Sequence, residues 1–170
     1  MNNLRDQYGI YISPRLFMWG SIRPDLYNDS INHFKEEEDN LFYQSFMDLT
    51  RDYGEEDIYE VKLGESFHYI ADYFCFAHNH KELKHNTYSH MTYELKLHQK
   101  AKKVNYSFLK DLKPSLLMEK YNFRGFMEYK HQEYLKNWSG PESDIQYSLQ
   151  VGSYEIFQIM IGKQFDIYAS

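Results

Sequence analysis

Residues 67–78 decide the fold, and they read Phe67-His68-Tyr69-Ile70-Ala71-Asp72-Tyr73-Phe74-Cys75-Phe76-Ala77-His78. This segment is apolar and aromatic and contains neither glycine nor proline, so the sequence predicts a helix along all of it. At about 100° per residue, His68 and Asp72 lie one turn apart on the same helix face. An ionised aspartate in so apolar a segment is costly unless its charge is neutralised. A metal cation held by His68 and Asp72 together would neutralise it.

Five further candidate ligands flank this pair along the chain: Asp25, His33, His78, His90 and Glu94. Imidazole nitrogen and carboxylate oxygen are the donors that zinc binds where cysteine is absent. One zinc ion needs about four ligands, so seven candidates suit two ions better than one. The pattern therefore predicts a multinuclear zinc site, in which a metal-activated water becomes hydroxide near neutral pH.

The length and composition favour a single soluble domain. The chain has 170 residues, of which 42% are hydrophobic, and its net charge is −6. That negative charge argues against a general affinity for nucleic acid or for anionic membrane surfaces. No stretch alternates polar and apolar residues over a useful length. We therefore expect an all-α fold in which residues 1–170 form one compact multi-helix bundle.

Glycine, proline and polar residues predict where the helices begin and end. Gly20 and Pro24 favour a loop over residues 19–25, so we expect Asp25 to be placed by a loop. A helix could begin near residue 28, and residues 79–87 are polar and read as a loop. The other predicted helices span about residues 57–78, 88–105, 114–138 and 143–165.

Cys75 is the only cysteine, so the chain has no internal disulfide. The N-terminal residues lack the apolar segment and cleavage site of an export signal. No apolar run is long enough to cross a bilayer. These features predict a cytoplasmic protein, with Cys75 a buried thiol.

Residue chemistry alone leaves a second interpretation open. A histidine and a carboxylate at i, i+4 on a helix are usually an ordinary side-chain pair, and Asp25 by itself would be a turn residue. Under that interpretation the chain is a metal-free helical interaction module.

Five pieces of sequence occur in order between about residues 16 and 98: Trp19-Gly20-Ser21-Ile22-Arg23-Pro24-Asp25; His33-Phe34; Leu63-Gly64 followed by His68-Tyr69-Ile70-Ala71-Asp72-Tyr73-Phe74; Ala77-His78-Asn79; and His90-x3-Glu94. Together they resemble the zinc-dependent phospholipase C family of bacteria. The resemblance implies an all-helical fold that is also similar to the single-strand nucleases of the S1/P1 type.

The resemblance also implies how the ligands divide. One zinc would be bound by Asp25, His33, His68 and Asp72, and a second by His78, His90 and Glu94. Asp25 would in addition be a candidate catalytic general base.

The family has a third zinc, to which the counterpart of Asp72 bridges, and its site is completed by the N-terminal residue and a nearby histidine. No histidine precedes His33 in this chain. We therefore expect two zinc ions, and the sequence leaves the third site open.

These observations predict a zinc-dependent phosphoester hydrolase, a phospholipase C-like phosphodiesterase. The expected substrate is a small phosphodiester or a phospholipid head group. The alternative is a zinc-binding helical protein that has lost catalysis and has a structural or interaction role.

Overall fold

The computed structural model describes residues 12–27, 49, 56–84, 86–111 and 123–169. These residues form helices and contain no β-strand, which confirms the predicted all-α class. The elements are α2 (Pro14–Tyr27), α4 (Glu56–Tyr73), α5 (Phe76–Asn79), α6 (Lys81–Lys84), α7 (Thr87–Ala101), the short 3-10 helix η1 (Tyr106–Asp111), α9 (Phe123–Asn137) and α10 (Pro141–Ala169). The helix expected to begin near residue 28 lies outside the described residues.

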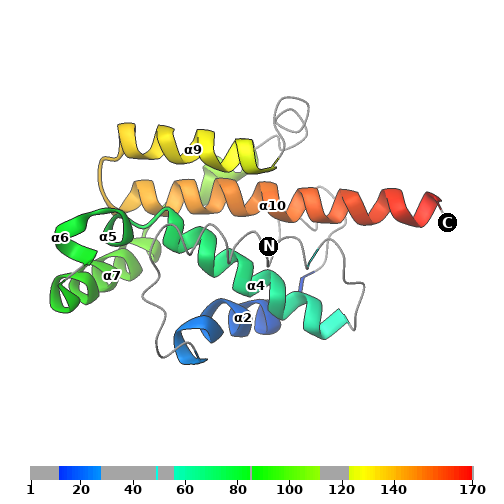
Figure 1. The fold of residues 1–170 in the computed structure, drawn as a ribbon, viewed down its shortest axis with the longest axis horizontal. Helices are drawn as coiled ribbons and strands as arrows, with labels where there is room; N and C mark the ends of the chain where they lie inside the picture. The colour runs from blue at the N-terminus through cyan, green and yellow to red at the C-terminus, as the bar shows by residue number, and fades with distance from the viewer. Residues whose placement is uncertain (1–11, 28–48, 50–55, 85, 112–122, 170) are drawn as a thin grey trace.

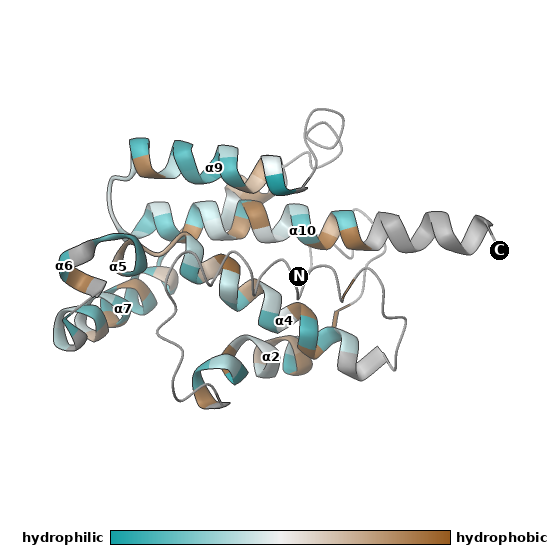
Figure 2. Cartoon of the chain, in the orientation of Figure 1, coloured by the Kyte–Doolittle hydropathy of each residue, from teal (hydrophilic) through white to brown (hydrophobic). Residues whose placement is uncertain are grey.

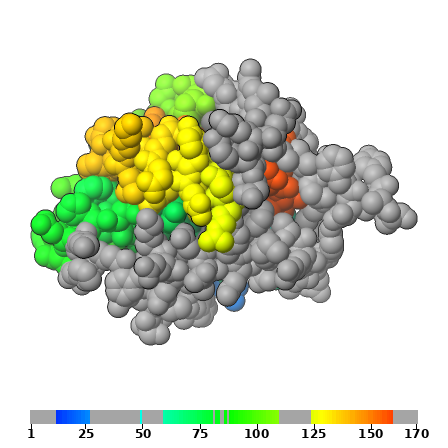
Figure 3. Space-filling model, turned by 45° about the horizontal axis from the view of Figure 1, so that its top comes forward, coloured from blue at the N-terminus to red at the C-terminus, as the bar shows by residue number. Residues whose placement is uncertain are grey.

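The α4 helix crosses the middle of the molecule, with α2 packed along one side and α10 passing it on the other (Figure 1). The α9 helix lies along α10, and α5, α6 and α7 gather near the start of α10. In Figure 3, α9 covers the front of the molecule beside the beginning of α10. The helices α5, α6 and α7 therefore lie together at one end of the bundle, beside the end of α4 and the start of α10.

The predicted loop over residues 19–25 is wrong, because these residues belong to α2. Gly20 faces Gly64 of α4, and a Cβ atom on Gly20 would collide with the carbonyl oxygen of Val61. Gly20 therefore serves close packing of two helices and not a turn. Pro24 lies inside the helix and is buried. Tertiary packing here outweighs the local preference of proline to end a helix.

The predicted continuous helix over residues 57–78 is also wrong, because α4 ends at Tyr73 and α5 is a separate helix. The Asn79 side chain stabilises this break: its Nδ2 donates to the carbonyl oxygens of Tyr73 and Cys75, each at 2.9 Å. These two bonds tie Asn79 to the last residue of α4 and to Cys75, whose carbonyl also accepts from the N–H groups of His78 and Asn79. The expected polar loop that follows likewise contains the one-turn helix α6.

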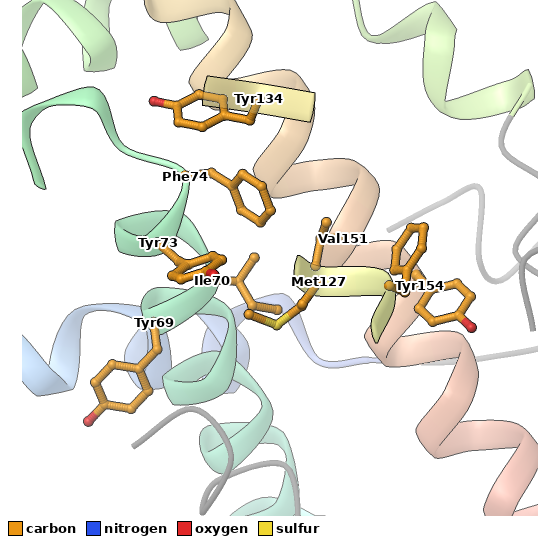
Figure 4. Packing of buried hydrophobic residues seen from close by; sticks show 9 residues of the cluster. Tyr69, Ile70, Tyr73, Phe74, Met127, Tyr134, Val151 and Tyr154 are labelled. Carbon is orange, nitrogen blue, oxygen red and sulfur yellow. The ribbon is translucent and has the colours of Figure 1, made fainter. Parts of the chain in front are cut away.

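Buried apolar side chains form two clusters among the described residues, and the larger is an aromatic cluster where three helices meet (Figure 4). Its buried members are Tyr69, Ile70, Tyr73, Phe74, Phe126, Met127, Tyr134, Val151 and Tyr154. Burying each such side chain stabilises the fold by about 1.5–3 kcal/mol relative to exposure. Only one stripe of α9 contributes to this cluster, and the rest of that helix is mostly hydrophilic (Figure 2).

The long helix α10 begins just after a break in the chain that the sequence predicts at residues 139–141. Gly140 has a φ of 139°, a conformation that favours glycine, and Pro141 occupies the first helical position. The helix begins two residues before its predicted start, and the sequence places its C-terminal end too early. Within the described part of the chain, no helix combines the length and hydropathy needed to cross a membrane.

Candidate metal centre

His68 is held by α2 at the point where the glycine contact brings the two helices together. Its Nδ1 lies 3.0 Å from the carbonyl oxygen of Ser21. A carbonyl can only accept, so Nδ1 carries the proton and donates it. Nε2, on the other side of the ring, therefore carries a lone pair when the ring is neutral and a second proton when the ring is charged. A backbone carbonyl commonly orients metal-binding histidines in this way.

The Nε2 atom of His68 faces two carboxylates. It lies 3.2 Å from Oδ2 of Asp72 and 3.6 Å from Oδ1 of Asp25. The Asp72 side chain is 16% exposed, whereas that of Asp25 is 66% exposed. We call Asp25, His68 and Asp72 the first group. Its open side is at Asp25.

A second group consists of His78 on α5 with His90 and Glu94 on α7. One donor atom from each lies within 4.8 Å of the others. Glu94 Oε1 is 2.9 Å from His90 Nε2 and 3.8 Å from His78 Nε2. The predicted i, i+4 pair on α7 is thus joined by a histidine from another helix.

Asp72 lies between the two groups. Its Oδ2 faces His68 at 3.2 Å, and its Oδ1 is 3.8 Å from Nε2 of His78. The two oxygens of one carboxylate therefore point to histidines of different groups. This arrangement brings six of the seven predicted ligands into one continuous cluster, and His33 lies outside the described residues.

The electrostatics of the cluster follow from these contacts. Burial lowers the pKa of His68, but the hydrogen bond and charge of Asp72, with the charge of Asp25, reverse this and raise it above its usual value. The interaction with His78, and then the charge of His90, hold the pKa of Glu94 below its usual value against desolvation. His78 and His90 therefore stabilise the charged form of Glu94.

The residues present fit zinc. The donors are imidazole nitrogens and carboxylate oxygens, which are zinc ligands, and they approach from two groups that share Asp72. Three carboxylates converge on three histidines, so neutral imidazoles would leave an excess of negative charge that a divalent cation offsets.

The other histidines that the structure describes lie elsewhere. His80 and His98 are exposed, whereas His131 on α9 is 1% exposed and buried in the core. Since both protons of Asn79 Nδ2 are donated to carbonyls, Asn79 Oδ1 is the acceptor for His131 Nε2 at 3.0 Å. His131 thereby supports the residue that stabilises the break between α4 and α5.

Sequence reasoning missed three residues that support the cluster: Ser21, Asn79 and Asp144. Asp144 is 2% exposed and accepts four hydrogen bonds from three parts of the chain. A carboxylate in the first turn of a helix is ordinary by sequence, since it favours the helix dipole. No local pattern could have identified its distant partners.

Comparison with known proteins gives a match to one family model. A protein-family model described as zinc dependent phospholipase C matches residues 1–140. No curated protein and no solved structure matches the chain. The matched residues include all seven predicted ligands and end just before α10.

Proposed function

The chain belongs to the zinc dependent phospholipase C family, and from this premise we propose that it is a zinc-dependent hydrolase of phosphodiesters. The observation that carries the proposal is the position of Asp72 between two groups of ligand-type side chains. Its two oxygens lie 3.2 Å from His68 and 3.8 Å from His78. A shared carboxylate is suited to hold two cations close together.

In this proposal the first group, with His33, holds one zinc ion, and the second group holds another. Zinc, when bound, supplies Lewis-acid chemistry: it lowers the pKa of water and offsets the charge that develops on phosphoryl oxygens. The carbonyl of Ser21 keeps His68 in the tautomer that presents Nε2 to the cluster. His68 is buried and the Asp72 side chain is only 16% exposed, which limits competition from bulk water at those donors.

Asp25 is the residue that we assign to proton transfer. It is the most exposed carboxylate of the first group, so water and a phosphodiester can both reach it. As a water oxygen attacks phosphorus, the Asp25 carboxylate accepts a proton from that water, and the bond from phosphorus to the leaving oxygen breaks. The substrate is a small phosphodiester or the head-group ester of a phospholipid.

The test is hydrolysis of bis(p-nitrophenyl) phosphate and of a short-chain phosphatidylcholine by the chain. Chelation should abolish turnover, and added zinc should restore it. His68→Ala and His90→Ala should each lower turnover by roughly 10³-fold or more, because each removes one ligand-type side chain. His98→Ala is the matched control, since His98 lies on the same helix as His90 but is exposed.

Two outcomes would contradict the proposal in different ways. Turnover that survives complete metal removal would exclude zinc chemistry. Zinc bound at about two ions per chain, with no hydrolysis of any phosphodiester, would favour the alternative of a zinc-binding protein with a structural role.

A further inference from the structure

Asp144 is a buried carboxylate to which four neutral donors converge. Oδ1 accepts from Trp138 Nε1 at 2.7 Å and from Tyr134 Oη at 3.0 Å. Oδ2 accepts from Tyr93 Oη at 2.7 Å and from the backbone N–H of Phe76 at 3.0 Å. Burial raises the pKa of Asp144, and these donors oppose that rise. An ionised carboxylate can accept all four bonds.

One of these bonds caps the helix that carries His78. The α5 helix has only four residues, too few to be stable by itself. Its N-cap residue, Cys75, makes no side-chain capping bond. The N–H of Phe76 is instead bound by Asp144, which is 68 residues away in sequence. The Phe76 ring also stacks on Trp138, with centroids 3.8 Å apart, and Trp138 itself donates to Asp144.

A second bond fixes the helix that carries His90 and Glu94. Tyr93 lies on α7 between these two residues, one position before Glu94. Because side chains follow each other at about 100° around a helix, anchoring the Tyr93 hydroxyl sets the rotation of α7 about its axis. The same Oδ2 atom of Asp144 therefore holds both elements of the second group.

We infer that Asp144 is a positioning residue for the second group: its carboxylate sets the relative placement of His78 on α5 and of His90 and Glu94 on α7. This inference rests on the proposed function where it concerns zinc. Asp144 lies beyond the residues that the family model matches. Its carboxylate reaches the helices of the second group through its bonds to Phe76 and Tyr93.

The isosteric variant Asp144→Asn breaks this arrangement in either orientation of the amide. Each carboxylate oxygen faces one N–H group that can only donate, Phe76 on one side and Trp138 on the other. The new NH₂ group must oppose one of them. Tyr93→Phe is milder, because it removes a single hydroxyl and leaves the ring that packs near Phe76.

The experiment is a zinc titration of protein with ¹⁵N-labelled histidine, followed by NMR of the imidazole rings. In Asp144→Asn and Tyr93→Phe, saturation of His78 and His90 should require roughly tenfold more zinc or greater, as for other residues that orient metal ligands. His68 should saturate as in the parent. Glu155→Gln is the matched control, since it alters another buried carboxylate of α10, and it should leave all three rings unchanged.

Unchanged saturation of His78 and His90 in both variants would overturn the inference. So would an equal shift of His68, which would indicate general loss of structure. If the parent binds no zinc, the proposed function fails, and the zinc-free spectra then decide. There the inference requires that Tyr93→Phe move the His78 and His90 signals but not that of His68, and unmoved signals would overturn it.

Discussion

The two groups of candidate ligands are supported in different ways. The first group lies on two long helices that contact each other through glycine, and its histidine is oriented by a carbonyl of the neighbouring helix. The second group lies on a four-residue helix and on α7. Its support comes from α10, through bonds that span 68 and 51 residues of sequence.

This difference shows which ligand positions can be predicted from local sequence spacing and which cannot. Where ligands lie on long helices, their spacing and the close approach of the helices place them. Where a ligand lies on a helix too short to be stable, distant side chains must place it. The first group should therefore be sensitive to helix packing, and the second to the hydrogen bonds of Asp144.

The largest loss of stability is expected from Gly64→Ala, which disturbs the packing of α2 on α4 beneath the first group. A Cβ atom on Gly64 would collide with the carbonyl oxygen of Phe17 and would lie 2.8 Å from the backbone nitrogen of Ser21. Backbone atoms cannot move aside as a side-chain tip can, so the helices must separate. We expect a loss of about 4 kcal/mol or more in the free energy of unfolding, measured with urea.

The control for this variant is Gly152→Ala on α10. Its added Cβ atom would meet the ring of Phe67 at 2.5 Å, and a ring can shift further than backbone. Gly152→Ala should therefore cost less than Gly64→Ala. Equal stability of Gly64→Ala and the parent would show that glycine is not required where α2 meets α4.

A smaller effect, which depends on pH, is expected at the contact between α4 and α10. The Ser66 hydroxyl of α4 donates to Oε1 of Glu155, which is fully buried, and Oε2 has no hydrogen-bond partner among the described residues. Desolvation raises the pKa of Glu155 from 4.5 to about 8. Between these values the folded protein retains a proton that the unfolded chain has released.

Glu155 should therefore contribute most to the free energy of unfolding below about pH 4.5. This free energy should fall by about 1.4 kcal/mol per pH unit from there up to about pH 8. Between about pH 5.5 and about pH 7.5 the expected loss is about 3 kcal/mol. Urea unfolding of the parent and of Glu155→Gln over this range measures it, because the variant lacks the titrating group. Parallel pH profiles of the two proteins would contradict the prediction.

The all-α class and the cluster of ligand-type residues could be predicted from the sequence. Helical spacing alone puts His68 beside Asp72 and His90 beside Glu94, and these pairs are found. The assignment of all seven residues as zinc ligands stays a prediction, with His33 outside the described part of the chain.

The local structure around Asp25 and His78 could not be predicted, because packing there overrides sequence signals. By local rules, Gly20 and Pro24 predict a loop. In the structure, Gly20 instead allows α2 to approach α4 closely because it has no side chain. The end of α4 has no glycine or proline, and the Asn79 amide stabilises the break by donating to the carbonyl of Tyr73, the last residue of α4, and to that of Cys75, the N-cap of α5. The partners of Asp144 are likewise tertiary, and no spacing rule relates residues so far apart.

The smallest expected effect tests whether α7 is held by its own N-cap or by its hydrogen bond to α10. Asn86 is the N-cap of α7, and its Oδ1 accepts from the N–H of Ser89 at 3.0 Å. Asn86→Ala should cost about 1 kcal/mol of folding free energy, the usual value for a lost N-cap. Asn105→Ala is the control, because Asn105 Oδ1 also accepts a local bond, from the N–H of Ser107 two residues on, and lies outside the second group.

The zinc titration gives the discriminating result for this pair. If α7 is placed chiefly by Tyr93, Asn86→Ala should leave the zinc saturation of His90 within about twofold of the parent, because an N-cap stabilises the helix end without setting its rotation. A tenfold loss, equal to that expected of Tyr93→Phe, would show that the second group depends on its own helix as much as on α10. The contrast between the two groups would then lie in α5 alone, where four residues leave no room for local support.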